Sequence, residues 1–399
     1  MLSIFGHILT AASVVHLVGL LASGAVGIGV MTCSLYGWGR LARSLTRHPN
    51  GTWPVTVALG VSCVIFLGGL LNLCRLALPV GLAGIVLVGL ALTTLARRQD
   101  GYRLWKIETP LVRWELALQW TAALALTGFT IAFQLAPSLY NTGDDFQQYF
   151  PHAVRMVETG TLYGSPLNGL GGVALGTQAF LQGFIIAFFP IRFINGADAV
   201  FCFFLCLVLP LAVTIERPAL RVAGLAGTLA AFLIDPQHTN VSSLFSMSAI
   251  VSALVILSVD PRERPDGGSL CWRQSAVPAL FYAGAAALKP TSLVFLGLHF
   301  VITVIASYLE TLNARGALAR AGWIAAWALI FISPWPLLYS PYYVVGLLNP
   351  IGQSVNALLN PIGRSSRLLP ELRGFPSIGS LLSPAPTFYG APRLRYTLS

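Results

Sequence analysis

The sequence predicts an all-α integral membrane protein with about ten transmembrane helices, and two observations support this fold class. Of the 399 residues, 55% are hydrophobic and only 10% are charged, against roughly 25% charged in a soluble domain. The apolar residues also form runs close to the roughly 20 residues that a helix needs to cross the hydrocarbon. A soluble protein this apolar could not cover its surface, so lipid must solvate much of the chain.

Eight apolar runs have the length of a transmembrane helix. They are 8–33, 54–74, 79–97, 115–136, 197–215, 241–259, 291–309 and 321–339. Two shorter runs, 219–234 and 275–288, cross only if they tilt or if the bilayer thins around them. A further run, 172–190, fits either a transmembrane helix or a re-entrant or interfacial helix.

The placement of Lys and Arg predicts the orientation of these helices. If the N-terminus faces outward and 172–190 does not cross, the inward loops hold 15 of the 24 Lys and Arg residues. Those loops are 36–53, 97–114, 216–221, 260–275 and 310–320. A crossing helix at 172–190 would put the arginines of the last two loops outside, although basic residues collect on the cytoplasmic side. The net charge of +10 therefore reflects membrane orientation, and we expect no nucleic-acid binding.

The predicted domain organisation has three parts. Residues 1–114 form an N-terminal block of three transmembrane helices, and residues 115–340 form a transmembrane core. The core includes an outward acidic loop at 139–171 and a juxtamembrane helix at 172–190. Residues 341–399 form an outward tail rich in Pro, Gly and Ser, which we expect to be partly disordered.

An acidic pair, Asp144-Asp145, stands in the outward loop of this otherwise apolar chain. Negative charge suits the N-terminus of a following helix, so the pair has a purely structural interpretation. Two adjacent carboxylates can also act as a general base beside a charge partner, or as oxygen ligands for Mg²⁺, Mn²⁺ or Ca²⁺. The residues themselves leave these alternatives open.

An amphipathic helix along the membrane surface is predicted directly after the acidic pair. The positions that define its apolar face, spaced by four, four and three residues, are Phe146, Phe150, Val154 and Val157. Pro151 is unfavourable inside a helix, so the helix either kinks there or begins near Phe150. Gly160 is the expected C-cap.

Three elements of this region resemble the GT-C glycosyltransferases. They are the acidic pair Asp144-Asp145, the segment Met156–Leu162 (MVETGTL) and the segment Pro166–Gly169 (PLNG). The similarity is to the bacterial lipid-carrier-dependent branch, which includes enzymes like protein O-mannosyltransferases and aminoarabinose transferases. The chain departs from better-known members in its three extra N-terminal helices and in lacking a long outward soluble domain.

The resemblance implies a GT-C-like fold and an inverting transfer of a sugar at the periplasmic face of a bacterial inner membrane. The donor would be a polyprenyl phosphate sugar and the acceptor a lipid, polysaccharide or protein of the cell envelope. One of Asp144 and Asp145 would be the catalytic base. Some relatives hold a metal near this pair and others do not, so Mg²⁺ or Mn²⁺ bound by Asp145 and Asp235 stays an open alternative.

Five further residues are expected to bind substrate or phosphate under this resemblance. They are His152, Arg155, Asp235, His238 and Lys289. Asp235 and His238 can equally form a turn, His152 can be structural, and Lys289 can be a lysine at a helix end whose ammonium reaches the membrane surface. An ionisable residue between two apolar runs, as Lys289 is, is nevertheless a functional candidate because burying it is costly.

Two rival functions belong to other classes. A transporter or flippase would carry polar residues on broken helices at mid-membrane, whereas the polar residues recognised in this sequence concentrate at one face. A non-catalytic envelope-assembly protein could keep the same fold.

Overall fold

Every element that the computed structural model describes is a helix. The structure describes residues 11–49, 51–100, 113–135, 150–163, 176–212, 226, 243–260, 272–289 and 292–338. Within these ranges there is no β-strand, which confirms the predicted all-α class. The C-terminal tail and most of the predicted helix 219–234 lie outside the described residues.

Five helical segments in the described part are long and apolar enough to cross a membrane. They are Leu17–Thr46 within α2 (Ala11–Thr46), α3 (Trp53–Leu73), Pro79–Arg98 within α4 (Pro79–Asp100), Leu293–Glu310 within α12 (Leu293–Thr311), and Ala314–Leu338, which joins α13 (Ala314–Ile332) to α14 (Pro334–Leu338). These segments overlap five of the predicted apolar runs and support a membrane protein. The prediction of about ten crossing helices goes beyond them.

The remaining described helices are shorter. They are α5 (Arg113–Phe129) with the π-helical turn η2 (Thr130–Gln134), α6 (Phe150–Thr159), α7 (Thr177–Ile186), the 3-10 turn η6 (Ile191–Phe193), η7 (Gly196–Cys202), α8 (Phe203–Val208), η8 (Leu209–Ala212), α10 (Leu244–Val259) and α11 (Ala276–Leu288). The predicted run 197–215 is thus not one regular helix, because it passes from π-helical η7 through α8 to 3-10 helical η8. Pro210 lies in η8, where its ring disfavours continuation of an α-helix.

The first helix is much longer than its apolar run predicted. α2 continues past residue 33 to Thr46, so Arg40 and Arg43 lie on a helix and not in the loop expected at 36–53. The Arg43 side chain is completely buried. Its guanidinium donates to the carbonyl of Pro49 at 2.8 Å, which links the end of α2 to the connection toward α3.

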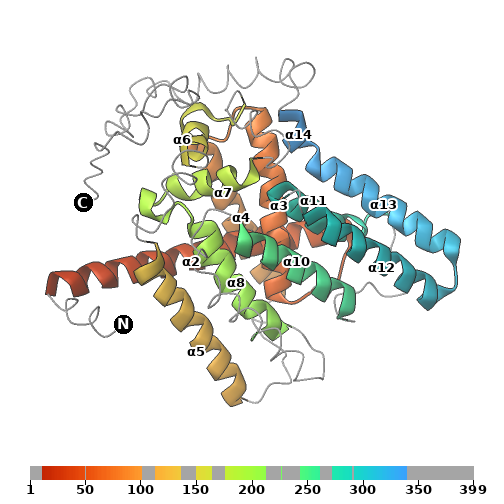
Figure 1. The fold of residues 1–399 in the computed structure, drawn as a ribbon, viewed down its shortest axis with the longest axis horizontal. Helices are drawn as coiled ribbons and strands as arrows, with labels where there is room; N and C mark the ends of the chain where they lie inside the picture. Colours follow the sequence, from red (N-terminus) through yellow and green to blue (C-terminus); the bar gives the residue numbers. More distant parts are fainter. Residues whose placement is uncertain are drawn as a thin grey trace.

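α3 lies at the centre of the molecule and is buried along most of its length (Figure 1). α2 runs across α3 in this view, so the candidate membrane helices do not share one direction. Two glycines allow the close approach of α2 and α3. A Cβ on Gly39 would meet the carbonyl of Thr56, and a Cβ on Gly60 would meet the carbonyl of Leu35.

α7 occupies the place predicted for a juxtamembrane helix at 172–190, but it is an interior element. Its ten residues span about 15 Å, roughly half the thickness of the hydrocarbon. Every residue from Thr177 to Ile185 is buried, and α7 contacts α3, α6, η7 and α11. The helix is therefore enclosed by protein, and its position relative to a membrane stays a prediction.

Candidate functional site

The structure describes three of the seven predicted site residues. His152 and Arg155 lie on α6, and Lys289 follows the last residue of α11. Asp144, Asp145, Asp235 and His238 lie outside the described residues. Their predicted roles, and any cation bound by Asp145 and Asp235, therefore stay predictions.

Helix α6 ends where the sequence indicated. Its described part starts at Phe150, directly before Pro151. Gly160 ends it with φ at +76°, which confirms the predicted C-cap. Only glycine suits this position, because a Cβ would also meet the carbonyl of Arg75.

The described part of α6 buries one side of the helix against the core. The buried residues are Phe150, His152, Ala153 and Met156, whereas Val154 and Val157 are only partly covered. Gly183 of α7 leaves room for the side chains of Met156 and Val157 and for the Ala153 carbonyl. The apolar pattern of α6 alone did not contain this information.

Asn72 anchors the end of α6 to the last turn of α3. Its completely buried amide group donates to the carbonyl of Gly68 at 2.8 Å and accepts from the N–H of Leu162 at 2.9 Å. The Asn72 carbonyl accepts from the Thr161 hydroxyl at 2.7 Å, and the Ala77 N–H donates to the carbonyl of Gly160 at 3.0 Å. These bonds fix where α6 leaves the core, and with it the side chains of His152 and Arg155.

A concentration of positive charge lies where α3 and α6 meet. Burial and the neighbouring Arg75 guanidinium lower the pKa of Arg155. The Arg155 guanidinium donates to the carbonyl of Tyr163 at 3.1 Å. Two guanidiniums close enough to repel each other suit a phosphate, which would accept hydrogen bonds from both. Arg75 is not among the residues that the sequence singled out.

His152 does not add to this charge at neutral pH. Its side chain is only 3% exposed. Burial, and then the Arg155 guanidinium, lower the pKa of His152 from 6.5 to about 4. The imidazole is therefore neutral at pH 7, and its burial favours the structural interpretation over direct phosphate binding.

A buried carboxylate that sequence reasoning missed lies inside the helical core. Asp198 is on η7 and is 1% exposed. One carboxylate oxygen accepts from the backbone N–H of Ser246 at 2.7 Å and from the Ser246 hydroxyl at 2.6 Å. Because Ser243, at the start of α10, makes no side-chain cap, Asp198 caps that helix from a neighbouring element.

Around Asp198 several polar groups are buried without a hydrogen-bond partner in the described part of the chain. They are the second carboxylate oxygen of Asp198, the amide oxygen of Gln178, and both amide atoms of Gln182. Gln178 and Gln182 are one turn apart on α7, and Gln178 donates to the Asn195 side chain at 3.4 Å. Unsatisfied buried groups of this kind indicate bound water or a ligand. We call Gln178, Gln182, Asn195, Asp198 and Ser246 the polar cluster.

Helix α7 connects the two charged regions. It contacts α6, which carries His152 and Arg155, and it contacts η7 and α11, which carry Asp198 and lead to Lys289. Lys289 is half-buried and close enough to Asp198 for electrostatic attraction. Lys289 thus lies near Asp198 of the polar cluster, and two members of that cluster, Gln178 and Gln182, are on α7 itself.

The described residues hold no group of three or more His, Cys, Asp and Glu side chains that could bind a metal ion. The cation left open by the resemblance thus depends on the acids outside the described ranges.

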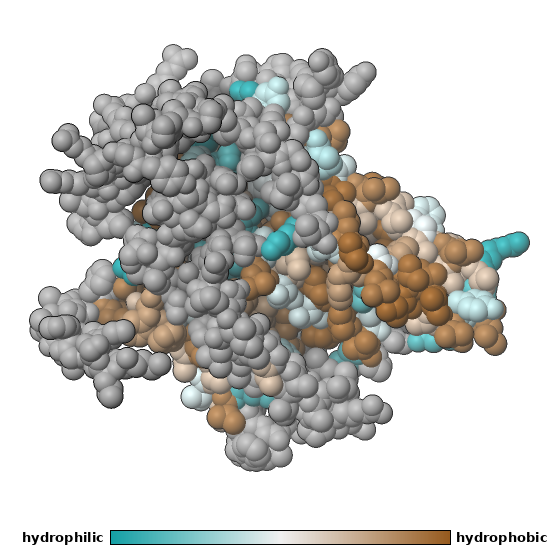
Figure 2. All heavy atoms as spheres, viewed as in Figure 1, coloured by the Kyte–Doolittle hydropathy of each residue, from teal (hydrophilic) through white to brown (hydrophobic). Residues whose placement is uncertain are grey.

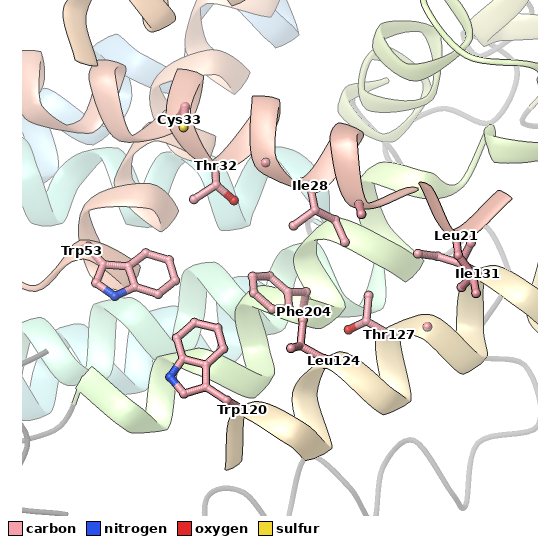
Figure 3. A pocket seen from close by; sticks show the side chains of 13 residues that line it. Leu21, Ile28, Thr32, Cys33, Trp53, Trp120, Leu124, Thr127, Ile131 and Phe204 are labelled. Carbon is pink, nitrogen blue, oxygen red and sulfur yellow. The ribbon is translucent and has the colours of Figure 1, made fainter. Parts of the chain in front are cut away.

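A separate apolar pocket of about 640 Å³ lies between α2, α5 and α8 (Figure 3). At one end Trp53 and Trp120 stack with their ring centroids 6.2 Å apart. Leu124, Ile131 and Phe204 are among its other lining residues. The described lining residues include no acidic or basic side chain, so they can hold a hydrocarbon chain but offer no cation to a phosphate.

Asp198 had a recognisable sequence signal, because it is the only acidic residue in the apolar stretch 196–212. The Arg75–Arg155 proximity had none, since it depends on how α6 docks against α3. Compared with known proteins, the chain matches no family model, no curated protein and no solved structure.

Proposed function

We propose that the protein is a membrane glycosyltransferase that moves a sugar from a polyprenyl phosphate donor to a cell-envelope acceptor on the outer face of a bacterial inner membrane. The observation that carries the proposal is the Arg75–Arg155 pair at the end of α6. Asp145 precedes Phe150, the first described residue of α6, by five positions. A short piece of chain therefore carries both an acidic pair and a cation suited to a phosphate.

The proposed reaction needs one base and one anion-binding group. A carboxylate of Asp144 or Asp145 takes the proton from the acceptor nucleophile, which attacks the anomeric carbon of the sugar. The bond between that carbon and the phosphate oxygen breaks, the configuration inverts, and polyprenyl phosphate leaves. Arg75 and Arg155 would stabilise the leaving phosphate through charge-assisted hydrogen bonds.

The test is sugar transfer by the purified full-length protein in lipid nanodiscs. Polyprenyl phosphate mannose and polyprenyl phosphate aminoarabinose serve as labelled donors, with a bacterial envelope extract as acceptor. Asp144→Asn or Asp145→Asn should lower transfer by at least 100-fold, because an amide cannot accept the proton. Glu158→Gln is the matched control, since Glu158 is exposed on α6 and should leave transfer unchanged.

Binding of polyprenyl phosphate itself gives a second measurement that does not depend on the sugar. Arg75→Gln should weaken it at least tenfold. Lys289→Ala tests whether the lysine beside the polar cluster contributes to this binding. Lys106→Ala is the control for the loss of one positive charge, because these are the only two lysines of the chain. Full transfer in both Asp variants would contradict the proposal.

A transporter or flippase is a second candidate, favoured by one observation. Asp198 is a buried acid on a π-helical segment inside the core, and irregular helices with intramembrane acids occur in transporters. Proteoliposomes with a fluorescent phospholipid would measure translocation. Asp198→Asn should abolish it if the charge is needed, yet keep the α10 cap because the amide oxygen still accepts a hydrogen bond. No translocation by the unmodified protein would dismiss this candidate.

A further inference from the structure

The polar cluster lies where α7, η7 and α10 meet. Gln178 of α7 donates to the Asn195 side chain at 3.4 Å, and a Cβ on Gly196 would lie 3.6 Å from the Ile185 side chain. Gln182 lies between Gln178 and Ile185 on the same face of α7, because residues three and four apart on a helix share a face. This face of α7 is therefore turned toward the first turn of η7.

Asp198 belongs to that turn of η7. Its backbone N–H donates to the Asn195 carbonyl at 3.1 Å. Its Oδ1 atom accepts both hydrogen bonds from Ser246 of α10, at 2.7 and 2.6 Å. The Oδ2 atom is buried and has no hydrogen-bond partner in the described part of the chain. One oxygen of this carboxylate is thus free to bind something else.

The two glutamines of α7 add further unpartnered atoms. The Oε1 atom of Gln178 and both amide atoms of Gln182 are buried and lack a hydrogen-bond partner among the described residues. The Gln182 side chain is 1% exposed and that of Gln178 is 6% exposed, so bulk water does not reach them. Three unpartnered oxygens, against one nitrogen, suit an occupant that attracts oxygen lone pairs.

No direct contact cancels the charge of Asp198. Among the described residues, the charged side chain close enough to attract it is that of Lys289, which is half-buried at the end of α11. The Lys289 ammonium makes no hydrogen bond to Oδ2. Attraction over this longer distance lowers the cost of burying the carboxylate but leaves Oδ2 without a ligand. Buried charges in proteins are paired directly or bind a metal ion.

The surroundings of the cluster make an unpaired carboxylate costly. Phe203 and Phe245, next to Ser246 in sequence and space, pack with their ring centroids 4.8 Å apart. Figure 2 shows hydrophobic side chains over the α12–α13 part of the molecule, so the polar atoms lie inside while this outer surface is apolar. η7 is also π-helical, and such segments are frequent at functional sites. An ionisable residue in this position indicates a binding site.

We propose that the polar cluster binds one monovalent alkali cation, Na⁺ or K⁺, held by Asp198 Oδ2 and the amide oxygens of Gln178 and Gln182. Carboxylate and carbonyl oxygens suit hard cations of this kind. A single carboxylate balances one positive charge, which favours a monovalent ion over Ca²⁺ or Mg²⁺. A water molecule kept by the ion would accept from the Gln182 amide N–H. The ion would hold α7 against η7, and this role requires neither glycosyl transfer nor lipid translocation.

The first experiment measures the melting temperature of the purified full-length protein in detergent. NaCl, KCl and N-methylglucamine chloride are compared at equal pH and ionic strength. Na⁺ or K⁺ should raise the melting temperature by at least about 3 °C over N-methylglucamine, because an ion that binds only the folded protein stabilises it. The salt with the larger effect identifies the ion. Binding of radiolabelled Na⁺, or of Rb⁺ as a substitute for K⁺, should then reach one ion per chain.

Two variants test the ligands. Asp198→Asn should abolish the cation effect, while its amide oxygen still caps α10. Gln182→Met should weaken ion binding by about tenfold, and it keeps the acid intact if the Asp198 variant does not fold. Gln119→Met is the matched control, because Gln119 is a buried residue of α5 with an unpartnered amide oxygen outside the cluster. It should respond to the cation like the unmodified protein.

Lys289→Ala tests the charge balance. It should strengthen cation binding by about twofold, because the ammonium repels a second cation beside Asp198. Equal melting temperatures in the three salts, with no bound radiolabelled ion, would mean that water or a protonated carboxyl satisfies the cluster and would overturn the proposal. A cation effect that persists in both Asp198→Asn and Gln182→Met would place the ion elsewhere and overturn it too.

Discussion

At the scale of single residues, the location of His152 on α6 determines its protonation. Burial and Arg155 lower its pKa to about 4, whereas an unfolded histidine titrates near 6.5. Between these values the unfolded chain binds more protons than the folded one. Stability that is present at pH 7 is therefore lost as the pH falls from about 6.5 toward 4.

His152→Gln should make the protein less sensitive to acid, because glutamine does not titrate. The pKa of His152 falls from 6.5 in the unfolded chain to about 4 in the folded protein, which corresponds to about 3 kcal/mol of unfolding free energy. The melting temperature, measured between pH 7 and pH 4, should fall by fewer degrees in the variant than in the unmodified protein. His48 contributes with the same sign, since its pKa is lowered to about 3, so part of the sensitivity should persist. Identical pH profiles for both proteins would contradict this account.

Residue roles were predictable only where local pattern determines them. Gly160 was recognisable as a C-cap because a left-handed residue there follows from the helix end itself. Asp198 needed its partner Ser246, which lies 48 residues away in sequence, to become a tertiary helix cap. The proximity of Arg75 and Arg155 depends on docking of α6 against α3, and nothing in either segment encodes it separately.

At the scale of elements, the contact between α2 and α3 depends on glycine. Gly60→Ala should lower the melting temperature by several degrees, corresponding to about 1–3 kcal/mol, because the new Cβ would collide with the Leu35 backbone and force the helices apart. Gly19→Ala is the matched control on α2. No atom lies within 4 Å of its added Cβ, so its stability should be unchanged or slightly higher. An unchanged melting temperature for Gly60→Ala would contradict the assigned contact.

Hydropathy predicted where helices occur better than which side they bury or where they end. The run 8–33 marked the apolar part of α2, but the helix continues to Thr46 because Arg43 finds buried partners in the following turn. On α6, the apolar pattern selected Val154 and Val157. The space beside Gly183 admits Met156 as well as Val157. In both cases a tertiary contact adds to what the local pattern indicates.

At the scale of the whole molecule, the distribution of arginines predicts which side faces out. In a cysteine-free background, Thr142→Cys should react with a membrane-impermeant maleimide in intact cells. Leu312→Cys, in the exposed turn between α12 and α13, should react only after the membrane is permeabilised. The reverse pattern would overturn the predicted orientation, and with it the outward position of the acidic loop.

The membrane character of the chain was predictable because composition and run length are properties of sequence alone. The packing directions were not. Figure 1 shows α2 across α3, and such crossings arise from glycine contacts between segments that hydropathy treats as equivalent. The predicted set of about ten crossing helices includes short helices such as α11, whose 13 residues are all buried, and whether α11 crosses stays a prediction. An apolar helix surrounded by protein and one surrounded by lipid have the same composition.

The central position of α3 has a consequence for how the protein is made. α3 is apolar enough to enter a bilayer as soon as it is synthesised, yet its final neighbours include α10, α11 and α14, which are encoded about 170 residues or more downstream. Until those helices arrive, lipid must occupy the surface that they later cover. A chain interrupted after α8 would thus leave the middle of the molecule facing the bilayer, in a form that membrane quality control could recognise. Completion of the C-terminal helices is therefore the step that closes the core.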